Sequence, residues 1–324
     1  MASRLRALRD DLGYVGIRAL LGGSRALPLA ALRAVGRAAA RCALALPGRD
    51  RGRARQHIAI AFSDRPEAWR RKLLGACAGH LGAVLGEVAW LWSAAPEAIL
   101  ARTEFVGLEH LTGALGAERG ALLVTGHCGN WEWLNLGLGA SGVPMTVAAR
   151  QVYDPRLGEV ARRLRGRFGG ETALRGQGAG AKLLHALHHG RVIGLLIDQD
   201  IEAPGAFVEF FGRPAWTPTG AALLAVRTGR PIVTGFAVRL PDGTMRLEFD
   251  PPTAPPAGED LDADVATLTA ALTARIERQV RAHPEQWVWM HKRWRHQPGD
   301  GEPVWRDAPS QPHPAHAPPA ARVG

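Results

Sequence analysis

Short apolar runs bounded by glycine alternate with helical stretches over most of the chain, and this alternation restricts its fold more than any other feature. The segments "GALLVTG" (120–126) and "VIGLLIDQD" (192–200) predict buried strands. Strands alternating with helices favour an α/β fold, with a largely parallel central sheet flanked by helices. The other predicted strands are 103–111 (with a turn), 144–150, 231–240 and 244–250, and the predicted helices are 131–141, 154–168, 178–190, 218–229 and 261–284.

The chain divides into three predicted parts, distinguished by charge and composition. Residues 1–100 form a basic helical region that associates with membranes: residues 1–75 alone hold 16 Lys and Arg against 5 Asp and Glu. Residues 101–296 form the α/β domain. Residues 297–324 are rich in Pro, His, Ala and Gly and form a predicted disordered tail.

The basic excess of the N-terminal region predicts an acidic partner, namely an anionic membrane surface or an acidic carrier protein. Nucleic acid is the weakest candidate, because neither zinc-ligand spacing nor interleaved exposed aromatics accompany the arginines. Arg33, Arg37 and Arg41 form a stripe at helical spacing. The stripe fits a helix at a membrane interface and, equally well, the solvated face of a core helix.

Membrane spans, disulfides and metal sites are not predicted. The chain has no run of about 18 uncharged apolar residues, and therefore no predicted transmembrane helix. Cys42, Cys77 and Cys128 are far apart and odd in number, so neither a disulfide framework nor a zinc site is expected.

His127 and Glu132 stand five residues apart in "LLVTGHCGNWEW" (122–133). On one continuous helix their side chains would point about 140° apart. If the strand ends before His127 and the helix begins near Asn130 or Trp131, Glu132 lies in the first helical turn and can accept a hydrogen bond from the imidazole. Alternatively, Glu132 only stabilises the helix N-terminus, and His127 is a polar turn residue.

Two further carboxylates follow the other buried strand. Asp198 and Asp200 are alternate residues of "IDQD", which predicts that their side chains lie on the same side. Functional sites in α/β sheets form at the carboxyl ends of strands, so one or both line the predicted site or cap the next segment. Cys128 adjoins His127, but adjacent turn residues rarely face each other, so it is interpreted as a small hydrophobic residue.

The segment "GHCGNWE" (126–132) resembles the His-x4-Asp/Glu signature of glycerolipid and lysophospholipid acyltransferases, and most closely that of the bacterial lipid A biosynthesis acyltransferases. Further segments resemble that branch in the same order, and together they cover about residues 5–296. These segments are "AARQVYDPRL" (148–157), "IDQD" (197–200) with the following 207–233, and "PEQWVWMHKRWR" (284–295).

The resemblance implies an O-acyltransferase without a cofactor. His127 would take a proton from a hydroxyl of a glycolipid, such as a lipid A precursor, and Glu132 would orient His127. The hydroxyl would attack the thioester of acyl-ACP or acyl-CoA, at the cytoplasmic face of the bacterial inner membrane, with the protein peripheral or monotopic. Arg150 and the backbone of Gly126–Gly129 would stabilise the oxyanion. The predicted substrate-binding residues are Arg150, Asp198, Asp200, Arg213 and Arg175, the last two because arginine suits phosphate geometry.

Other functions remain open from the sequence. The acceptor can instead be a phosphatidylinositol mannoside or another lysolipid. A metal-dependent hydrolase built from His127, Glu132, Asp198 and Asp200 is a more remote possibility. The third is a membrane-binding protein whose site is a non-catalytic relic.

Overall fold

The computed structural model describes residues 2–45, 48–116, 120–176 and 178–299. Its centre is a seven-stranded sheet with the order β1-β9-β8-β2-β5-β3-β4. All pairs are parallel except β8 with β9, so the predicted α/β fold is confirmed. The strands are β1 Thr103–Val106, β2 Ala121–Thr125, β3 Met145–Ala149, β4 Glu171–Leu174, β5 Val192–Leu196, β8 Ile232–Arg239 and β9 Met245–Phe249.

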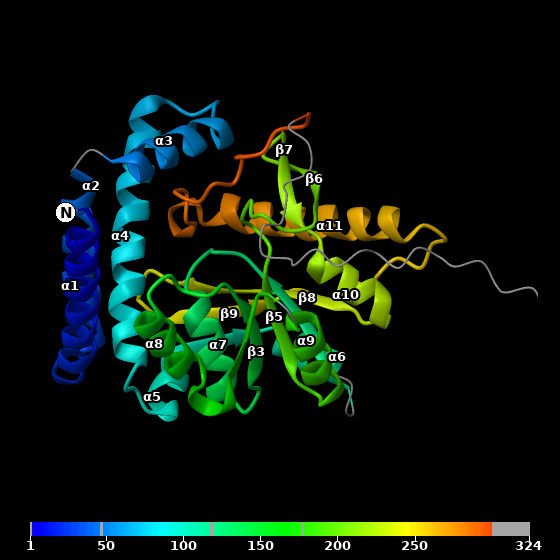
Figure 1. Ribbon diagram of the computed structural model, residues 1–324, viewed down its shortest axis with the longest axis horizontal. Coiled ribbons are helices and arrows are strands. Elements are labelled where there is room, and N and C mark those ends of the chain that lie inside the picture. Colours follow the sequence, from blue (N-terminus) through cyan, green and yellow to red (C-terminus); the bar gives the residue numbers. More distant parts are fainter. Residues whose placement is uncertain (1, 46–47, 117–119, 177, 300–324) are drawn as a thin grey trace, which may run out of the picture.

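Helices cover both faces of this sheet (Figure 1). Leu122 and Val124 of β2 join the apolar core formed with α9, α10 and α11, whereas Leu123 joins the core formed with α5, α6 and α7. Successive residues of a strand face opposite sides of a sheet, so β2 is buried on both faces as predicted. These helices are α5 Pro96–Leu100, α6 Leu108–Leu115, α7 Trp131–Ala140, α8 Pro155–Arg165, α9 Ala179–His188, α10 Gly220–Thr228 and α11 Leu261–Ala282, with short 3-10 helices η2 Arg167–Gly169 and η3 Pro284–Gln286.

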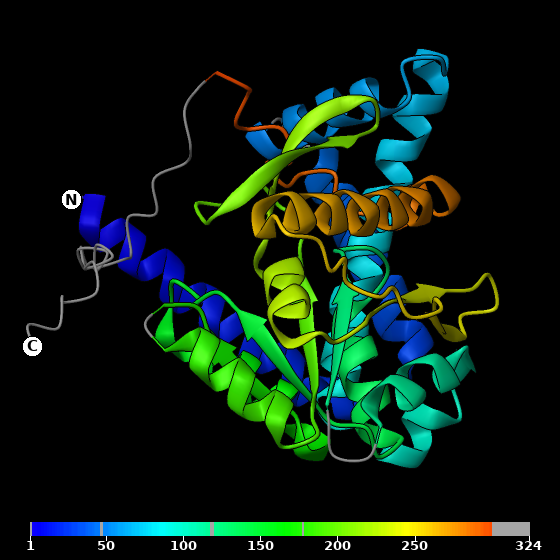
Figure 2. The same ribbon diagram turned by 90° about the vertical axis from the view of Figure 1, so that its right-hand side faces the viewer.

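A hairpin that the sequence analysis did not predict lies across α11 (Figure 2). Its strands are β6 Gly205–Phe210 and β7 Arg213–Pro218, and they pair antiparallel. Phe211 and Gly212 form the two-residue turn, and both have positive φ angles, of 54° and 70°. A two-residue turn of this kind matches the twist of the flanking strands. The prolines within β7 obscured the strand pattern in the sequence.

The N-terminal region is helical, as predicted. Its long helix α4 packs along α2, and the two backbones approach most closely at Gly36 and Gly82, where an added Cβ atom would clash with backbone. By length and composition α4 could cross a membrane, but 67% of its most apolar window is buried inside the protein, as in a core helix. The N-terminal elements are α1 Ala2–Gly23, η1 Ser24–Ala26, α2 Leu29–Ala45, α3 Arg49–Ala61 and α4 Glu67–Leu91.

The arginine stripe on α2 does not form a membrane-facing surface along its whole length. Arg33 is buried and donates to the buried Glu87 of α4 over 2.7 Å. This end of the stripe therefore belongs to the packed interface between α2 and α4.

The apolar core crosses the predicted domain boundary at residue 100. Ile58 of α3 and Leu73 of α4 belong to the same core cluster as Leu122 of β2. The division into domains stays a prediction. Of the predicted tail 297–324, residues 300–324 lie outside the described residues.

Candidate active site

His127 and Asp198 meet at the carboxyl edge of the sheet. β2 and β5 are parallel neighbours, and Thr125 pairs with Leu196. The segments that follow the two strands therefore leave the sheet at the same level. His127 Nδ1 lies 2.7 Å from Asp198 Oδ1, and the backbone N–H of His127 donates to Asp198 Oδ2 over 2.6 Å. The parallel register thus brings together two residues that are far apart in the sequence.

Asp198 orients the imidazole of His127. Its carboxylate also accepts a hydrogen bond from the indole Nε1 of Trp287 over 2.8 Å, and its side chain is fully buried. Burial raises the pKa of Asp198, but the charge and hydrogen bond of His127 and the hydrogen bond of Trp287 outweigh burial and hold the pKa below its ordinary value. An ionised Asp198 requires a proton on Nδ1 of His127, which leaves Nε2 as a basic nitrogen.

The second nitrogen of His127 faces polar and aromatic neighbours. Gln199 Nε2 lies 3.1 Å from His127 Nε2 and 2.9 Å from Nε2 of His291. The ring of Trp131 meets His127 edge-on at 4.9 Å between centroids, and that of His291 at 4.6 Å. Burial and the neighbouring His127 lower the pKa of His291 to about 4, so His291 is neutral near pH 7.

The turn from His127 to Asn130 is held by segments distant in the sequence. Gly129 has a φ of 68°, and an added Cβ atom would clash with the carbonyl oxygen of Ala237, so glycine is required there. Gly129 N–H donates to Gln286 O over 2.8 Å, and Val288 N–H donates to His127 O over 3.1 Å. The C-terminal segment therefore fastens the turn that carries His127.

A buried charged cluster lies beneath this turn. Glu87 of α4 is fully buried and accepts from Arg33, from Arg239 of β8 and from the side chain of Asn130. His80 Nε2 lies 3.1 Å from Gly129 O. Burial raises the pKa of Glu87, but the two arginines and Asn130 hold it below its ordinary value. We call Arg33, His80, Glu87, Asn130 and Arg239 the buried charged cluster.

The predicted contact between His127 and Glu132 is wrong. The helix does begin at Trp131, Asn130 caps it by accepting from the N–H of Trp133, and Glu132 lies in its first turn. However, the Glu132 carboxylate binds Arg165 of α8, with Nε 3.0 Å from both oxygens and Nη2 2.5 Å from Oε1. Asp198 comes closer to His127 because the adjacent strands β2 and β5 place it there.

Asp200 binds a different partner from Asp198, so of the alternatives left open, one aspartate contacts His127 and the other holds a neighbouring segment. The Asp200 side chain is fully buried and accepts from the backbone N–H of His296 over 2.7 Å and pairs with His296 Nδ1 at 2.6 Å. Residues 197–202 are not a strand, so alternation does not hold. Within the described part of the chain, no three His, Cys, Asp or Glu side chains are arranged to hold a metal ion. The four ligands of the hydrolase hypothesis do not converge.

Arg150 and Arg175 follow the neighbouring strands β3 and β4. Ala149 pairs with Leu174, so both arginines leave the same carboxyl edge that carries His127, and both are exposed. Partial shielding of its guanidinium from solvent and the charge of Arg150 lower the pKa of Arg175. Two neighbouring cations at a strand edge are suited to an anion. Arg213 lies elsewhere, at the start of the hairpin strand β7.

The backbone amides of the turn are mostly used within the protein. The N–H groups of His127, Gly129 and Asn130 donate to Asp198, Gln286 and Ala237. The amides of His127 and Gly129 are therefore not free to bind an oxyanion, whereas the backbone of Gly126–Gly129 was predicted to do so. Cys128 is buried in the apolar core, and burial raises the pKa of its thiol well above the ordinary value, as expected of a packing residue.

Sequence reasoning missed four residues that contact His127 or its partner, one of which is Trp131 at the start of α7. Gln199 lies between the two noticed aspartates, and Trp287 and His291 lie in the C-terminal block, which the analysis treated as packing. The only signal in the sequence was that polar residues accompany the tryptophans of this block.

The sequence of this chain matches a known protein family. The sequence profile described as "Bacterial lipid A biosynthesis acyltransferase" matches residues 2–296, which include the whole sheet and every residue around His127. The chain belongs to this family. The predicted resemblance is thereby confirmed.

Individual relatives fall into two groups. A phosphatidylinositol mannoside acyltransferase of Mycobacterium tuberculosis (strain CDC 1551 / Oshkosh) is 30% identical over 191 residues, which is 58% of this chain and 58% of that relative. The lipid A biosynthesis lauroyltransferase of Escherichia coli (strain K12) is 29% identical over 251 residues, 75% of this chain and 78% of the relative. The lipid A biosynthesis myristoyltransferase of the same strain is 26% identical over 261 residues, 79% of each chain.

Proposed function

We propose that the protein transfers a fatty acyl chain from a thioester donor, acyl-ACP or acyl-CoA, to a hydroxyl of a glycolipid such as a lipid A precursor. The observation that carries this proposal is the pair of His127 and the buried, ionised Asp198. The pair leaves one basic imidazole nitrogen near the surface, with the His127 side chain 17% exposed. Membership of the acyltransferase family supports the same reaction.

In the proposed reaction His127 Nε2 removes the proton of the acceptor hydroxyl. The hydroxyl oxygen bonds to the thioester carbon, the C–S bond breaks, and the leaving thiolate takes the proton from Nε2. Asp198 stabilises the transient imidazolium. A positioned base of this kind typically contributes about 10²–10⁴-fold. The amide of Gln199, beside Nε2, is our candidate donor to the oxyanion, since the N–H groups of His127, Gly129 and Asn130 are already used within the protein.

The acceptor proposal rests on the relatives and on charge. The lauroyl- and myristoyltransferases support a lipid A precursor, and the mycobacterial relative supports a phosphatidylinositol mannoside as the second candidate. Both acceptor classes carry phosphate. Arg150 and Arg175 at the strand edge are proposed to bind this phosphate. Arg213, which lies away from this edge at the start of β7, is also proposed to bind phosphate. Glu132, held by Arg165, is proposed to fix the start of α7, where Trp131 packs against His127.

We also propose that α1 and α2 dock on the cytoplasmic face of the inner membrane. Both helices expose apolar side chains within the most basic part of the chain, for example Val15 (62% exposed) and Val35 (59%). Apolar residues among arginines suit a surface of anionic lipid.

Mass spectrometry of lipids tests the reaction. A deletion strain should lack one acyl group on a glycolipid, and the wild-type chain should restore it. His127→Ala should fail to restore it, while Cys128→Ala, which leaves the base intact, should succeed. Gln199→Leu should lower kcat about 10²-fold, as loss of one oxyanion donor does. Restoration by His127→Ala would refute the mechanism.

A further inference from the structure

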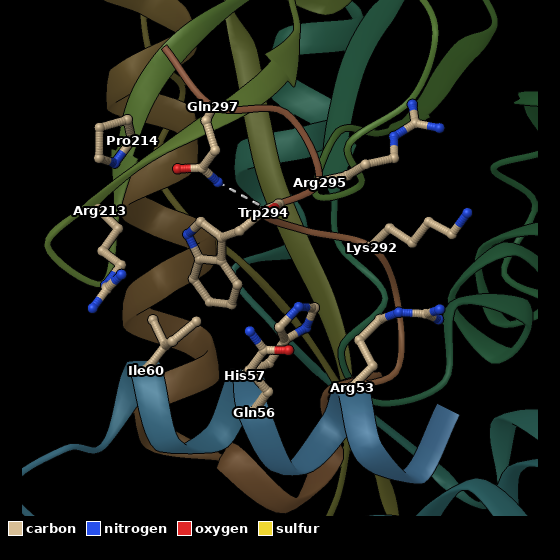
Figure 3. A pocket seen from close by; sticks show the side chains of 10 residues that line it. All are labelled: Arg53, Gln56, His57, Ile60, Arg213, Pro214, Lys292, Trp294, Arg295 and Gln297. Atoms are coloured by element: carbon tan, nitrogen blue, oxygen red, sulfur yellow. Dashed lines mark hydrogen bonds between the residues drawn. The ribbon is translucent and has the colours of Figure 1, made fainter. Parts of the chain in front are cut away.

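A cationic cavity lies between α3, the start of β7 and the C-terminal segment (Figure 3). Its volume is about 540 Å³, within the range of about 300–1,000 Å³ that is usual for ligand sites. Four of its lining residues are permanent cations, Arg53, Arg213, Lys292 and Arg295, and none is an Asp or Glu. His57 also lines it, and burial lowers the pKa of His57 to about 4, so it adds no charge near pH 7.

The cations keep donors for a ligand. Within the described residues, the side chains of Arg213 and Lys292 make neither an ion pair nor a hydrogen bond, and both residues are exposed. Arg53 uses its Nη1 for Asp50 and Met290 O, and Arg295 has only long contacts, at 3.5 Å to Asp200 and 3.4 Å to Glu202. A group of cations of which two have no counter-charge and two are only partly compensated attracts a multiply charged anion.

A second observation favours an oxygen-rich ligand. Trp294 also lines the cavity, and its indole Nε1 has no hydrogen-bond partner in the described part of the chain. Buried donors are nearly always paired, so this one calls for an acceptor, and Figure 3 shows it on the side of the cavity where Arg213 lies.

The cavity adjoins the candidate active site through one short segment. His291 packs against His127, and the next residue, Lys292, lines the cavity. In Figure 3 the charged ends of Arg53, Lys292 and Arg295 extend to the same side, whereas Arg213 lies beyond Trp294 and His57. The first three cations can therefore hold one ligand together, in a cavity whose residue Lys292 directly follows His291.

We propose that Arg53, Lys292 and Arg295 bind a phosphate group of one of the two substrates. The inference rests on the proposed acyl transfer and deepens it. The shared chemistry is a phosphate ester, which both a pantetheine-linked donor and a phosphorylated glycolipid acceptor carry. The three cations anchor this group while the rest of the substrate extends to His127.

Binding measurements by calorimetry test the site and identify the source of the phosphate. The probes are coenzyme A for the donor, glucosamine 1-phosphate for the acceptor, inorganic phosphate, and pantethine, which has the donor arm without phosphate. Coenzyme A or glucosamine 1-phosphate should bind more tightly than pantethine, and whichever of the two binds better names the source. Lys292→Gln should raise its Kd about fivefold and Lys292→Glu more, since hydrogen bonds to charged groups are strong but this one is exposed to solvent.

The matched control is Lys182→Gln, which removes the same charge from an exposed lysine of α9 outside the cavity and should leave Kd unchanged. An unchanged Kd in Lys292→Glu would overturn the inference. A Kd that increases as much in Lys182→Gln as in Lys292→Gln would also overturn the inference. The same holds if inorganic phosphate binds as tightly as both coenzyme A and glucosamine 1-phosphate.

The two proposals can fail separately. Binding is measured in His127→Ala as well, where it should be unaffected. A protein that binds coenzyme A through Lys292 but transfers no acyl group would refute the acyl transfer alone. A protein that transfers acyl groups but whose binding ignores Lys292 would refute the phosphate site alone.

Discussion

At the scale of residues, the chemistry depends on which carboxylate meets His127. Asp198 accepts three hydrogen bonds, two from His127 and one from Trp287, whereas Glu132 is committed to Arg165. A carboxylate that holds the imidazole fixes its tautomer and stabilises its charged form. A carboxylate paired with an arginine elsewhere can do neither.

Two isosteric substitutions separate these roles. Asp198→Asn should lower kcat by about 10²–10⁴-fold and change the pH profile of kcat, because the imidazolium loses its counter-charge. Glu132→Gln should leave the shape of the pH profile unchanged, because Glu132 does not contact His127. Steady-state kinetics across pH measure both. A pH profile altered by Glu132→Gln and not by Asp198→Asn would reverse the assignment.

The position of His127 could be predicted from the sequence, but its partner could not. The buried run before it and the N-cap residue Asn130 after it are local signals, and they correctly placed the histidine in a turn. The pairing with Asp198 depends on the register of β2 against β5, which no local pattern encodes. Alternation likewise failed for Asp200, because the chain leaves the strand before reaching it.

At the scale of elements, the N-terminal helices pack against the turn that carries His127 and support it. The buried charged cluster joins α2, α4 and β8 to Asn130 through Glu87, which compensates two arginines at once. The sequence predicted these helices, but it could not predict that their charges would be buried. Helical spacing alone does not tell whether a polar stripe faces solvent or another helix.

Glu87→Gln should destabilise the fold. It leaves Arg33 and Arg239 buried without a counter-charge, and breaking a buried ion pair in this way typically costs about 3–5 kcal/mol. The matched control is Glu104→Gln, which breaks a half-exposed pair with Arg246 and should cost no more than about 1 kcal/mol. Denaturant unfolding measures both, and equal losses would contradict the cluster's structural role.

At the scale of the whole molecule, buried histidines make stability depend on pH. Burial lowers the pKa of His57 to about 4, that of His80 to about 3 and that of His291 to about 4, against an ordinary value of 6.5. The unfolded chain therefore binds more protons than the folded one below pH 6.5.

The histidines should accordingly not reduce the free energy of unfolding above pH 6.5. The free energy of unfolding should fall as the pH decreases from 6.5 towards 4. Each of the three histidines contributes a slope of up to about 1.4 kcal/mol per pH unit. Denaturant titrations at several pH values measure the slope. His57→Gln should reduce the slope and His188→Gln, at an exposed position, should not. A stability that is flat over this range would contradict the prediction.

The proposed membrane docking also belongs to the whole molecule, because it depends on one end carrying the net excess of positive charge. Sedimentation with anionic vesicles should recover the protein at low salt, and added salt should weaken the binding by screening. Val35→Asp on α2 should reduce binding. Val106→Asp, which replaces an exposed valine of β1, should not. Equal binding to neutral vesicles would contradict the electrostatic part.

The fastening of the His127 turn by Gln286, Trp287 and Val288 has a consequence for protein synthesis. The ribosome completes the turn long before it makes the segment that closes it. Until that segment emerges, Asp198 lacks the indole donor and the turn lacks two of its backbone partners. A nascent chain, or one cut short by a premature stop codon upstream of this segment, therefore lacks the closed turn on which the proposed acyl transfer depends.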